Sequence, residues 1–169
     1  LRLHRRQREL EAQQRSLYWN QITTPLAPER RVGLMGLGVL GSDAATALTA
    51  LRFDVACWTR TPKEMPGVSG YHSADGLDAF LARTEILIAL MPLTDNTRGI
   101  LNASLFAKLP KGAGLINAGR GGLQIEADII TALDAGQLSE AVLDVFSTEP
   151  LPTDNPLWTH PKITITPHN

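Results

Sequence analysis

The stretch Arg31-Val-Gly-Leu-Met-Gly-Leu-Gly-Val-Leu-Gly-Ser42 decides the fold of this 169-residue chain. Its apolar start predicts a buried strand, and the spacing of Gly36, Gly38 and Gly41 predicts a tight turn into a helix. Gly36 would make the turn, Gly38 would let a pyrophosphate approach the backbone, and Gly41 would let the helix pack closely on its strand. A dinucleotide-binding turn is therefore predicted, with a purely structural turn as the alternative. The following helix is expected to bury an apolar face formed by Leu40, Ala44, Ala47, Leu48 and Leu51.

The second predicted strand, residues 54–58, bears on which dinucleotide would bind. In folds that bind NAD, an acidic residue about 20 positions after the glycines accepts a hydrogen bond from the ribose 2′-hydroxyl. This chain has Arg60 there, with Thr61 and Lys63 beside it. Such a group suits a 2′-phosphate, because guanidinium and ammonium groups donate charge-assisted hydrogen bonds to phosphate. NADPH is therefore the predicted cofactor, with NAD as the alternative. The alternative to a phosphate site is that these residues form an ordinary solvent-exposed basic loop.

The rest of the chain alternates between strand and helix patterns. Further strands are expected at residues 70–72, 85–90, 114–117, 141–146 and 163–166, and helices at residues 77–82, 102–109 and 125–135. Continuous apolar runs such as residues 85–90 are typical of parallel strands that are covered on both faces. The pattern predicts an α/β fold: a Rossmann-type, doubly wound parallel sheet of about seven strands, preceded by an N-terminal connecting helix.

The N-terminal region differs in composition from the rest of the chain. Residues 1–20 are expected to form the connecting helix, which is basic and has a thin apolar stripe made by Leu3, Leu10 and Leu17. Such a helix either docks on its own protein or contacts a membrane or nucleic acid, and docking is the favoured interpretation. Tyr18 and Trp19 supply apolar surface for packing or for a subunit interface. Residues 21–169 are assigned to the dinucleotide-binding domain, entered through a linker at residues 20–28.

Composition limits the classes of partner. The chain has 16 Lys and Arg against 17 Asp and Glu, for a net charge of −1, so neither nucleic acid nor an acidic membrane is expected as a partner. A single cysteine, Cys57, excludes an internal disulfide and favours a reducing compartment, the cytoplasm. No metal site is predicted, and no apolar run is long enough to span a bilayer.

Three chemically useful side chains follow predicted strands. Arg120 lies in a glycine-flanked loop, and Glu149 and His168 follow the last two strands. Taken singly, each is expected to be a surface or structural residue. Ligands of parallel sheets bind beyond the carboxyl ends of the strands, so the three together predict an active site there. Arg120 could then bind a carboxylate bidentately and polarise a carbonyl group.

With these residues in place, the chain resembles the cofactor-binding domain of the D-isomer-specific 2-hydroxyacid dehydrogenases. The glyoxylate/hydroxypyruvate reductase branch is the most similar. The resemblance covers nearly everything from Arg31 onward and is carried by residues 32–41, 91–94, 97–101, 116–121, 143–146, 149–152, 155–158 and 165–168. One departure is Arg52, which stands where family members usually carry glycine after the first helix.

The resemblance implies roles for individual residues. Arg120 would bind the oxo acid and orient its carbonyl, His168 would be the general acid in reduction, and Glu149 would pair with His168. Asp144 would contact the nicotinamide carboxamide. The full set of implied cofactor-binding positions is Gly36, Gly38, Val39, Leu40, Gly41, Arg60, Thr61, Pro92, Leu93, Thr97, Ala118, Gly119, Arg120, Asp144 and His168.

The implied activity is NADPH-dependent reduction of small 2-oxo acids, such as glyoxylate and hydroxypyruvate, to 2-hydroxy acids. Family members have a second, substrate-binding domain that this chain lacks, so the chain alone is expected to be inactive. The resemblance also implies a homodimer. The alternative from another class is a non-enzymatic NAD(P)-sensing protein of the corepressor type, since one fold supports both functions.

Overall fold

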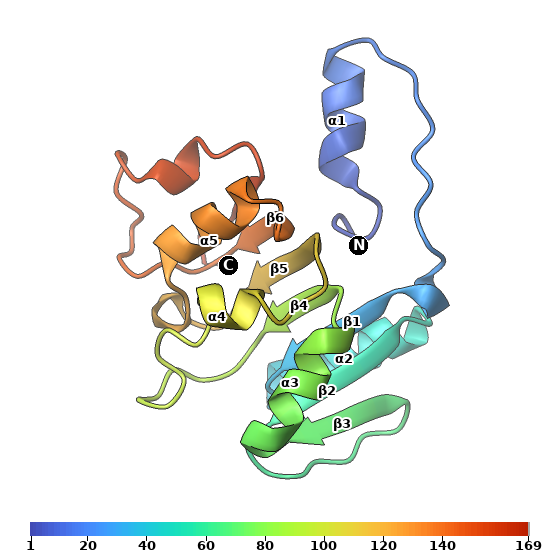
Figure 1. Ribbon diagram of the computed structural model, residues 1–169, viewed down its shortest axis with the longest axis vertical. Coiled ribbons are helices and arrows are strands. Elements are labelled where there is room, and N and C mark those ends of the chain that lie inside the picture. The colour runs from blue at the N-terminus through green and yellow to red at the C-terminus, as the bar shows by residue number, and fades with distance from the viewer. Residues whose placement is uncertain (169) are drawn as a thin grey trace.

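The computed structural model describes residues 1–168, which form one twisted, all-parallel sheet of seven strands in the order β3-β2-β1-β4-β5-β6-β7. Helices cover both faces, with α3, α4 and α5 in front of the sheet in Figure 1 and α2 behind it. The strands are β1 (Arg31–Met35), β2 (Asp54–Thr59), β3 (Val68–His72), β4 (Ile86–Ala89), β5 (Ala113–Asn117), β6 (Leu138–Leu143) and β7 (Ile163–Ile165). The helices are α1 (Gln7–Arg15), α2 (Val39–Ala50), α3 (Ser73–Arg83), α4 (Ala103–Phe106) and α5 (Glu126–Asp134). The predicted Rossmann-type fold is confirmed.

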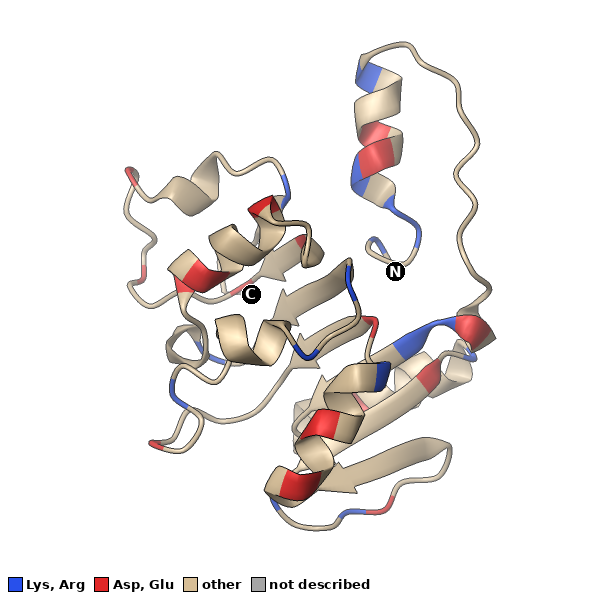
Figure 2. Cartoon of the chain, in the orientation of Figure 1, with Lys and Arg blue, Asp and Glu red and all other residues tan. Residues whose placement is uncertain are grey.

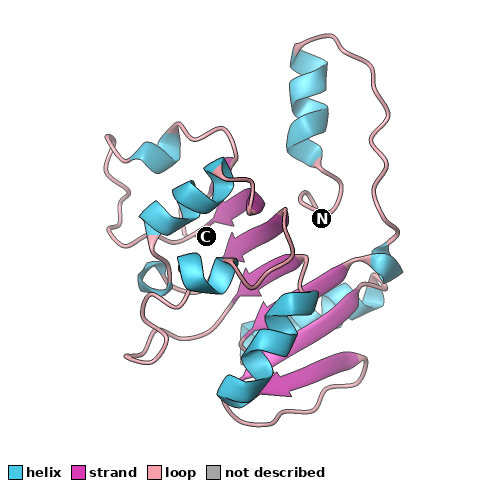
Figure 3. Cartoon of the chain, viewed as in Figure 1, coloured by secondary structure: helices cyan, strands magenta, loops and turns pink. Residues whose placement is uncertain are grey.

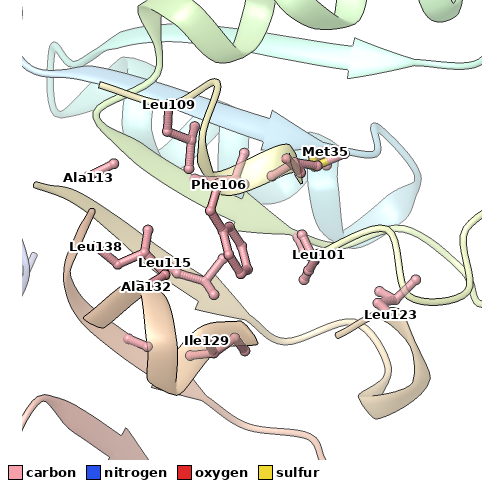
Figure 4. Close-up of a cluster of buried hydrophobic side chains, with 14 of the residues drawn as sticks. Met35, Leu101, Phe106, Leu109, Ala113, Leu115, Leu123, Ile129, Ala132 and Leu138 are labelled. Atoms are coloured by element: carbon pink, nitrogen blue, oxygen red, sulfur yellow. The ribbon is translucent and has the colours of Figure 1, made fainter. Parts of the chain in front are cut away.

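The main core lies between the sheet and the helices α3 to α5. Phe80, Phe106 and Leu115 are almost fully buried in it, and the labelled side chains of Figure 4 show how the cluster fills this layer. A smaller cluster around Leu34 and Phe53 lies under α2. Burying apolar surface on both faces of the sheet explains why β1, β4 and β5 read as continuous apolar runs.

Sequence patterns misplaced the bounds of several elements: the helix expected at residues 102–109 is Ala103–Phe106, and the one expected at residues 77–82 is Ser73–Arg83. The helix expected over residues 1–20 spans only Gln7–Arg15, because Arg6 and Leu17 adopt left-handed backbone conformations, with φ of 51° and 54°, that interrupt the helix on each side. Residues 16–26 follow as the long loop seen in Figure 3. The strand expected at residues 141–146 is Leu138–Leu143, since the chain leaves the ladder at Asp144 while Val145 and Phe146 remain buried in the core.

The buried face of α2 also differs from the expected one. Gly41 and Ala45 are buried, whereas Leu40 and Leu51 are 67% and 49% exposed. The close approach at Gly41 decides this rotation, because a β-carbon there would lie 2.3 Å from the Gly36 carbonyl oxygen. The helix therefore turns Gly41 and Ala45 toward β1. Of the expected face, Ala44 and Leu48 are partly buried against the smaller core, whereas Leu40 and Leu51 point outward.

Residues 3–8 attach the N-terminal segment to the rest of the protein. His4 is buried with its ring edge-on to Phe53, and Arg8 donates hydrogen bonds to the Ile163 carbonyl and the Thr164 hydroxyl, both at 3.0 Å. Figure 2 shows basic and acidic residues side by side on α1, which forms the ion pairs Arg2–Glu11 and Arg6–Glu9. The helix thus docks on its own chain through a few residues at its start.

Arg52 adopts the left-handed conformation that its place after α2 requires. Its φ is 66°, and the Phe53 amide bonds to the Leu48 carbonyl while the Arg52 amide bonds to the Thr49 carbonyl. This pattern is a Schellman motif, in which glycine is the preferred left-handed residue because it lacks a β-carbon.

We expect Arg52→Gly to raise the free energy of unfolding by about 1 kcal/mol, because glycine removes the steric cost of a β-carbon in this conformation. Chemical denaturation would measure the change. Arg52→Ala is the matched control: it removes the same guanidinium but keeps a β-carbon. A gain of equal size in Arg52→Ala would show that the charge, rather than the backbone, is responsible.

Candidate active site

The glycine-rich turn joins β1 to α2 at the carboxyl edge of the sheet. Gly36 has a φ of 102°, and a β-carbon there would lie 3.0 Å from the Leu90 carbonyl oxygen. A β-carbon on Gly38 would meet nothing within 4 Å, so this position opens onto free space. Packing therefore requires glycine at positions 36 and 41, whereas Gly38 leaves room for a ligand to approach the backbone.

The start of α2 borders this open space. Val39 and Leu40 are 81% and 67% exposed at the first turn of the helix, whose leading N–H groups have no carbonyl partners within the helix. A helix N-terminus of this kind, with a glycine turn before it, suits the pyrophosphate of a dinucleotide. The geometry of the turn therefore fits the group that the sequence motif predicts.

The loop after β2 carries the basic residues that bear on cofactor choice. Arg60 and Thr61 are exposed, and the Thr59 hydroxyl donates to the Thr61 carbonyl at 2.7 Å. Lys63 donates from Nζ to the Leu37 carbonyl in the glycine-rich turn at 2.8 Å. Within residues 1–168, the Arg60 guanidinium has no hydrogen bond or ion pair. Lys63 therefore ties the two loops together, while Arg60 is available for a phosphate.

The loop after β4 holds Pro92, Leu93 and Thr97 against the next loop. The Thr97 hydroxyl donates to the Pro92 carbonyl at 2.8 Å and accepts from the Thr94 amide at 2.8 Å, which folds the loop back on itself. A β-carbon on Gly122 would lie 2.8 Å from the Leu93 side chain. Leu93 thus packs directly over the segment that follows Arg120.

The loop that carries Arg120 is organised by the buried amide of Asn117. Its Oδ1 accepts from the Gly119 amide at 3.1 Å, and its Nδ2 donates to the Arg120 carbonyl at 3.2 Å. The Arg120 guanidinium donates to the Gly119 carbonyl at 2.7 Å, which holds it beside its own loop. A β-carbon on Gly121 would lie 1.8 Å from the Phe146 carbonyl oxygen, so the loop passes very close to the segment after β6.

His168 and Glu149 form a hydrogen-bonded pair. His168 Nδ1 lies 2.6 Å from Glu149 Oε2, and because a carboxylate only accepts, the ring nitrogen is the donor. Glu149 Oε1 accepts from the Phe146 amide at 2.9 Å. The His168 hydrogen bond, followed by that of Phe146, lowers the pKa of Glu149 below its usual value, and the Arg120 guanidinium contributes in the same direction. Glu149 is therefore ionised at neutral pH.

The backbone of His168 is itself unusual. Its φ is 57°, in the left-handed region that residues with a β-carbon rarely adopt, and strain of this kind gathers at functional sites. The neighbouring Asp144 accepts a hydrogen bond from the Thr166 hydroxyl. The segments after β6 and β7 are therefore tied to each other just before the His168 side chain.

A surface pocket of about 530 Å³ brings the candidate residues together. Leu93, Arg120, Glu149 and His168 all line it. A guanidinium that can hold a carboxylate thus shares one depression with an imidazole that can donate a proton. The predicted meeting of these side chains at the carboxyl edge of the sheet is what the structure shows.

Sequence reasoning missed one buried side chain at this site. Gln124 is 3% exposed and links Asn117 to the Val145 carbonyl. The pattern around it, Leu123-Gln124-Ile125, gives no sign of this, because its partners lie 7 and 21 residues away.

No group of three or more His, Cys, Asp or Glu side chains among residues 1–168 is placed to hold a metal ion. None of the helices described in this range is both long and apolar enough to cross a membrane.

The model of the D-isomer specific 2-hydroxyacid dehydrogenase family, NAD binding domain, matches residues 1–169. The chain belongs to this family and corresponds to its NAD-binding domain. The predicted resemblance is confirmed.

Among curated relatives, the chain is 44% identical over 168 residues to glyoxylate/hydroxypyruvate reductase A of Yersinia enterocolitica. That match covers 99% of this chain and 54% of the relative, so the chain spans about half of the relative's length. Among solved structures, it is similar to an NADPH-dependent glyoxylate/hydroxypyruvate reductase of Sinorhizobium meliloti in complex with NADP and sulfate. That structure is 47% identical with a TM-score of 0.95, and the match covers 99% and 54% of the two chains. A D-isomer specific 2-hydroxyacid dehydrogenase of Xanthobacter autotrophicus in complex with NADPH has 46% identity, a TM-score of 0.96 and coverage of 99% and 53%.

Proposed function

We propose that the enzyme containing this domain reduces small 2-oxo acids, such as glyoxylate and hydroxypyruvate, to 2-hydroxy acids with NADPH. The observation that carries the proposal is the pocket that Arg120 shares with the hydrogen-bonded Glu149–His168 pair at the carboxyl edge of a dinucleotide-binding sheet. The Yersinia and Sinorhizobium relatives are glyoxylate/hydroxypyruvate reductases, and the Sinorhizobium and Xanthobacter structures contain NADP and NADPH. A substrate-binding domain would correspond to the half of the relatives that this chain does not span, and residues 1–20 would connect the two domains.

Each polar side chain of the pocket has a distinct role in the proposed reaction. Arg120 binds the carboxylate of the oxo acid and orients its carbonyl oxygen. His168 donates a proton to that oxygen from Nε2, the ring nitrogen left over when Nδ1 bonds to Glu149. The ionised Glu149 accepts from Nδ1, which fixes the orientation of the ring and leaves Nε2 as the proton donor. NADPH, when bound, supplies the hydride.

The turn and the loop after β2 would hold the cofactor. Gly36, Gly38 and Gly41 shape the turn at the start of α2, where the pyrophosphate would lie, and Arg60 and Thr61 would bind the 2′-phosphate. The other proposed contacts come from loops at the same edge of the sheet: Val39, Leu40, Pro92, Leu93, Thr97, Ala118, Gly119, Arg120, Asp144 and His168. We also place the protein in a reducing compartment such as the cytoplasm, since its single cysteine is unpaired and buried in β2.

A panel of 2-oxo acids offered to the complete enzyme with NADPH tests the proposed function. Oxidation of NADPH with glyoxylate or hydroxypyruvate, followed by absorbance, is the expected result. NADPH binding without turnover on any member of the panel would contradict the proposal and leave a dinucleotide-sensing role.

We expect Arg60→Ala to weaken NADPH binding about tenfold and to leave NADH binding within about twofold, because only NADPH carries the 2′-phosphate that a charge-assisted hydrogen bond would hold. Calorimetric titration with each cofactor would measure both affinities. Lys111→Ala, which removes an exposed cation from the loop before β5, is the matched control. A preference for NADPH that survives in Arg60→Ala would remove this residue from the cofactor site.

The proposed homodimer uses the apolar arm Leu17-Tyr18-Trp19. These side chains are 94%, 62% and 94% exposed and lie next to one another after α1. Exposed aromatic residues of this kind mark protein interfaces, where Trp and Tyr often dominate the binding energy.

We expect the complete enzyme to sediment as a dimer and Trp19→Asp to sediment as a monomer, because a charge cannot be buried unpaired at an interface. Leu26→Asp, another exposed apolar residue outside the arm, should remain dimeric. A dimer that is unchanged in Trp19→Asp would place the interface elsewhere.

A further inference from the structure

Gln124 links the two halves of the pocket. Its Oε1 accepts from Asn117 Nδ2 at 2.8 Å, and its Nε2 donates to the Val145 carbonyl at 3.1 Å. Asn117 uses its remaining Nδ2 hydrogen on the Arg120 carbonyl, so the Gln124 amide lies between the arginine loop after β5 and the segment after β6. Asn117 and Gln124 are 0% and 3% exposed, which leaves water little access to these bonds.

The Val145–Phe146 peptide group continues the connection toward His168. Its carbonyl accepts from Gln124, and its N–H, which belongs to Phe146, donates to Glu149 Oε1 at 2.9 Å. A peptide group is planar and its C=O and N–H point in opposite directions, so fixing one end fixes the aim of the other. Glu149 then bonds to His168 through its second oxygen.

We propose that Gln124 is a positioning residue. It directs the Phe146 N–H toward Glu149 and thereby fixes the position of the Glu149–His168 pair relative to the Arg120 loop. The proposal rests on the proposed function, since it assigns the pair a role in proton transfer. It adds a residue at the floor of the pocket whose side-chain amide is committed to Asn117 and Val145, so that it acts on the Glu149–His168 pair through one peptide group.

The fold does not need the Gln124 side chain to shape its own loop. The Leu101 amide bonds to the Leu123 carbonyl at 2.9 Å, the Ile125 amide bonds to the Leu101 carbonyl at 3.0 Å, and the Gln124 amide bonds to the Gly121 carbonyl at 3.1 Å. The main chain on both sides of Gln124 is therefore held by backbone contacts. Its side-chain amide is left to connect the two neighbouring segments.

A double-mutant cycle in the complete enzyme tests this role. Gln124→Met keeps the length of the side chain and removes both hydrogen bonds, and we expect it to lower kcat for oxo-acid reduction about tenfold while the KM for NADPH stays within about twofold. In an enzyme that already carries Glu149→Gln, the same change should lower kcat less than about twofold, because residues that act through one another are not additive. Equal losses in both backgrounds, or no loss in either, would overturn the proposal.

Two further variants separate positioning from folding. Gln124→Glu keeps the acceptor for Asn117 but, when ionised, loses the donor to Val145, so it should show the same loss and serves if Gln124→Met does not fold. Gln137→Met is the matched control. It makes the same exchange and likewise removes two side-chain hydrogen bonds, those that Gln137 donates to the Phe106 and Leu109 carbonyls, away from the pocket. It should leave kcat unchanged in both backgrounds, and a loss like that of Gln124→Met would mark the effect as general destabilisation.

One measurement does not depend on turnover. Hydrogen exchange of the Phe146 amide, followed by NMR, should accelerate about tenfold in Gln124→Met, which loosens the peptide group, and in Glu149→Ala, which removes the acceptor of that N–H. If the unsubstituted enzyme reduced no oxo acid, the proposed function would fail, while this exchange rate would still decide whether Gln124 holds the peptide group. Unchanged exchange in Gln124→Met would refute the coupling on its own.

Discussion

Replacing His168 by Ala in the complete enzyme is expected to lower kcat for oxo-acid reduction by about 10²–10⁴-fold, the usual contribution of a positioned general acid. Affinity for NADPH should fall far less than kcat, because His168 is only one of many proposed cofactor contacts and the turn at Gly36 and the basic loop at Arg60 remain intact. Steady-state kinetics with glyoxylate and calorimetry with NADPH would measure the two effects separately. His160→Ala is the matched control, since His160 pairs with Asp134 just before β7 begins, at the opposite edge of the sheet. Turnover within about tenfold of the unsubstituted enzyme would exclude His168 as the proton donor.

The pH profile gives the same assignment a second test. The lowered pKa of Glu149 means that its carboxylate persists at neutral pH and is lost only as the pH falls below the usual range of a glutamate, about 4.3. The protonated imidazole of His168 is the proposed proton donor, so reduction should fall as the pH rises while the Glu149 carboxylate stays ionised. In Glu149→Gln the fall should occur at lower pH, because the neutral amide no longer stabilises the charge. Superimposable profiles of kcat/KM would remove the pair from the mechanism.

Replacing Arg120 by Lys is expected to lower kcat/KM for 2-oxo acids by about 10²–10³-fold, although the charge is kept. A guanidinium presents two parallel donors to a carboxylate and stays in place while the carbonyl is polarised, whereas an ammonium group binds as a single point charge. Kinetics with glyoxylate would measure the loss, and an unchanged NADPH affinity would show that the cofactor site is intact.

The control for Arg120 is Arg83→Lys, which makes the same exchange at an ion pair with Asp54 far from the carboxyl edge. It should leave kcat/KM within about twofold. If Arg120→Lys behaved in the same way, the substrate carboxylate would have to be held by another group, and Arg98, which also lines the pocket, would be the next residue to test.

Most of the fold could be predicted because parallel strands leave a strong signal. The runs that became β1, β4 and β5 are apolar on both faces, and the glycine turn marks the junction between β1 and α2. One error in the predicted strand bounds arose because a residue can be buried without being paired in the sheet. Val145 and Phe146 are buried as a strand would be, yet they follow β6 in a loop. The ends of α1 depend on left-handed residues that no apolar periodicity reveals.

The site could be predicted in part for a related reason. Residues that end strands of a parallel sheet converge at one edge, so Arg120, Glu149 and His168 could be grouped without knowing any distance. Gln124 could not be assigned to the site from the sequence. Its role depends on hydrogen bonds to Asn117 and Val145, which come close to it only in the folded chain. Lys63 was expected at the cofactor phosphate, yet its ammonium group bonds to the Leu37 carbonyl.

The position of β1 in the strand order has a consequence for how the protein folds. β1 pairs with β2 on one side and with β4 on the other, and Val32 and Ile86, which face each other there, are 54 residues apart in the chain. Parallel neighbours cannot be joined by a short hairpin, so each pairing requires the closure of a long loop, and sheets of this kind form slowly. The glycine turn at Gly36 and the loop that begins at Leu90 therefore come together only after the two halves of the sheet have met. The edge at which a dinucleotide would bind is therefore completed by the pairing of β4 with β1, and not by the glycine turn alone.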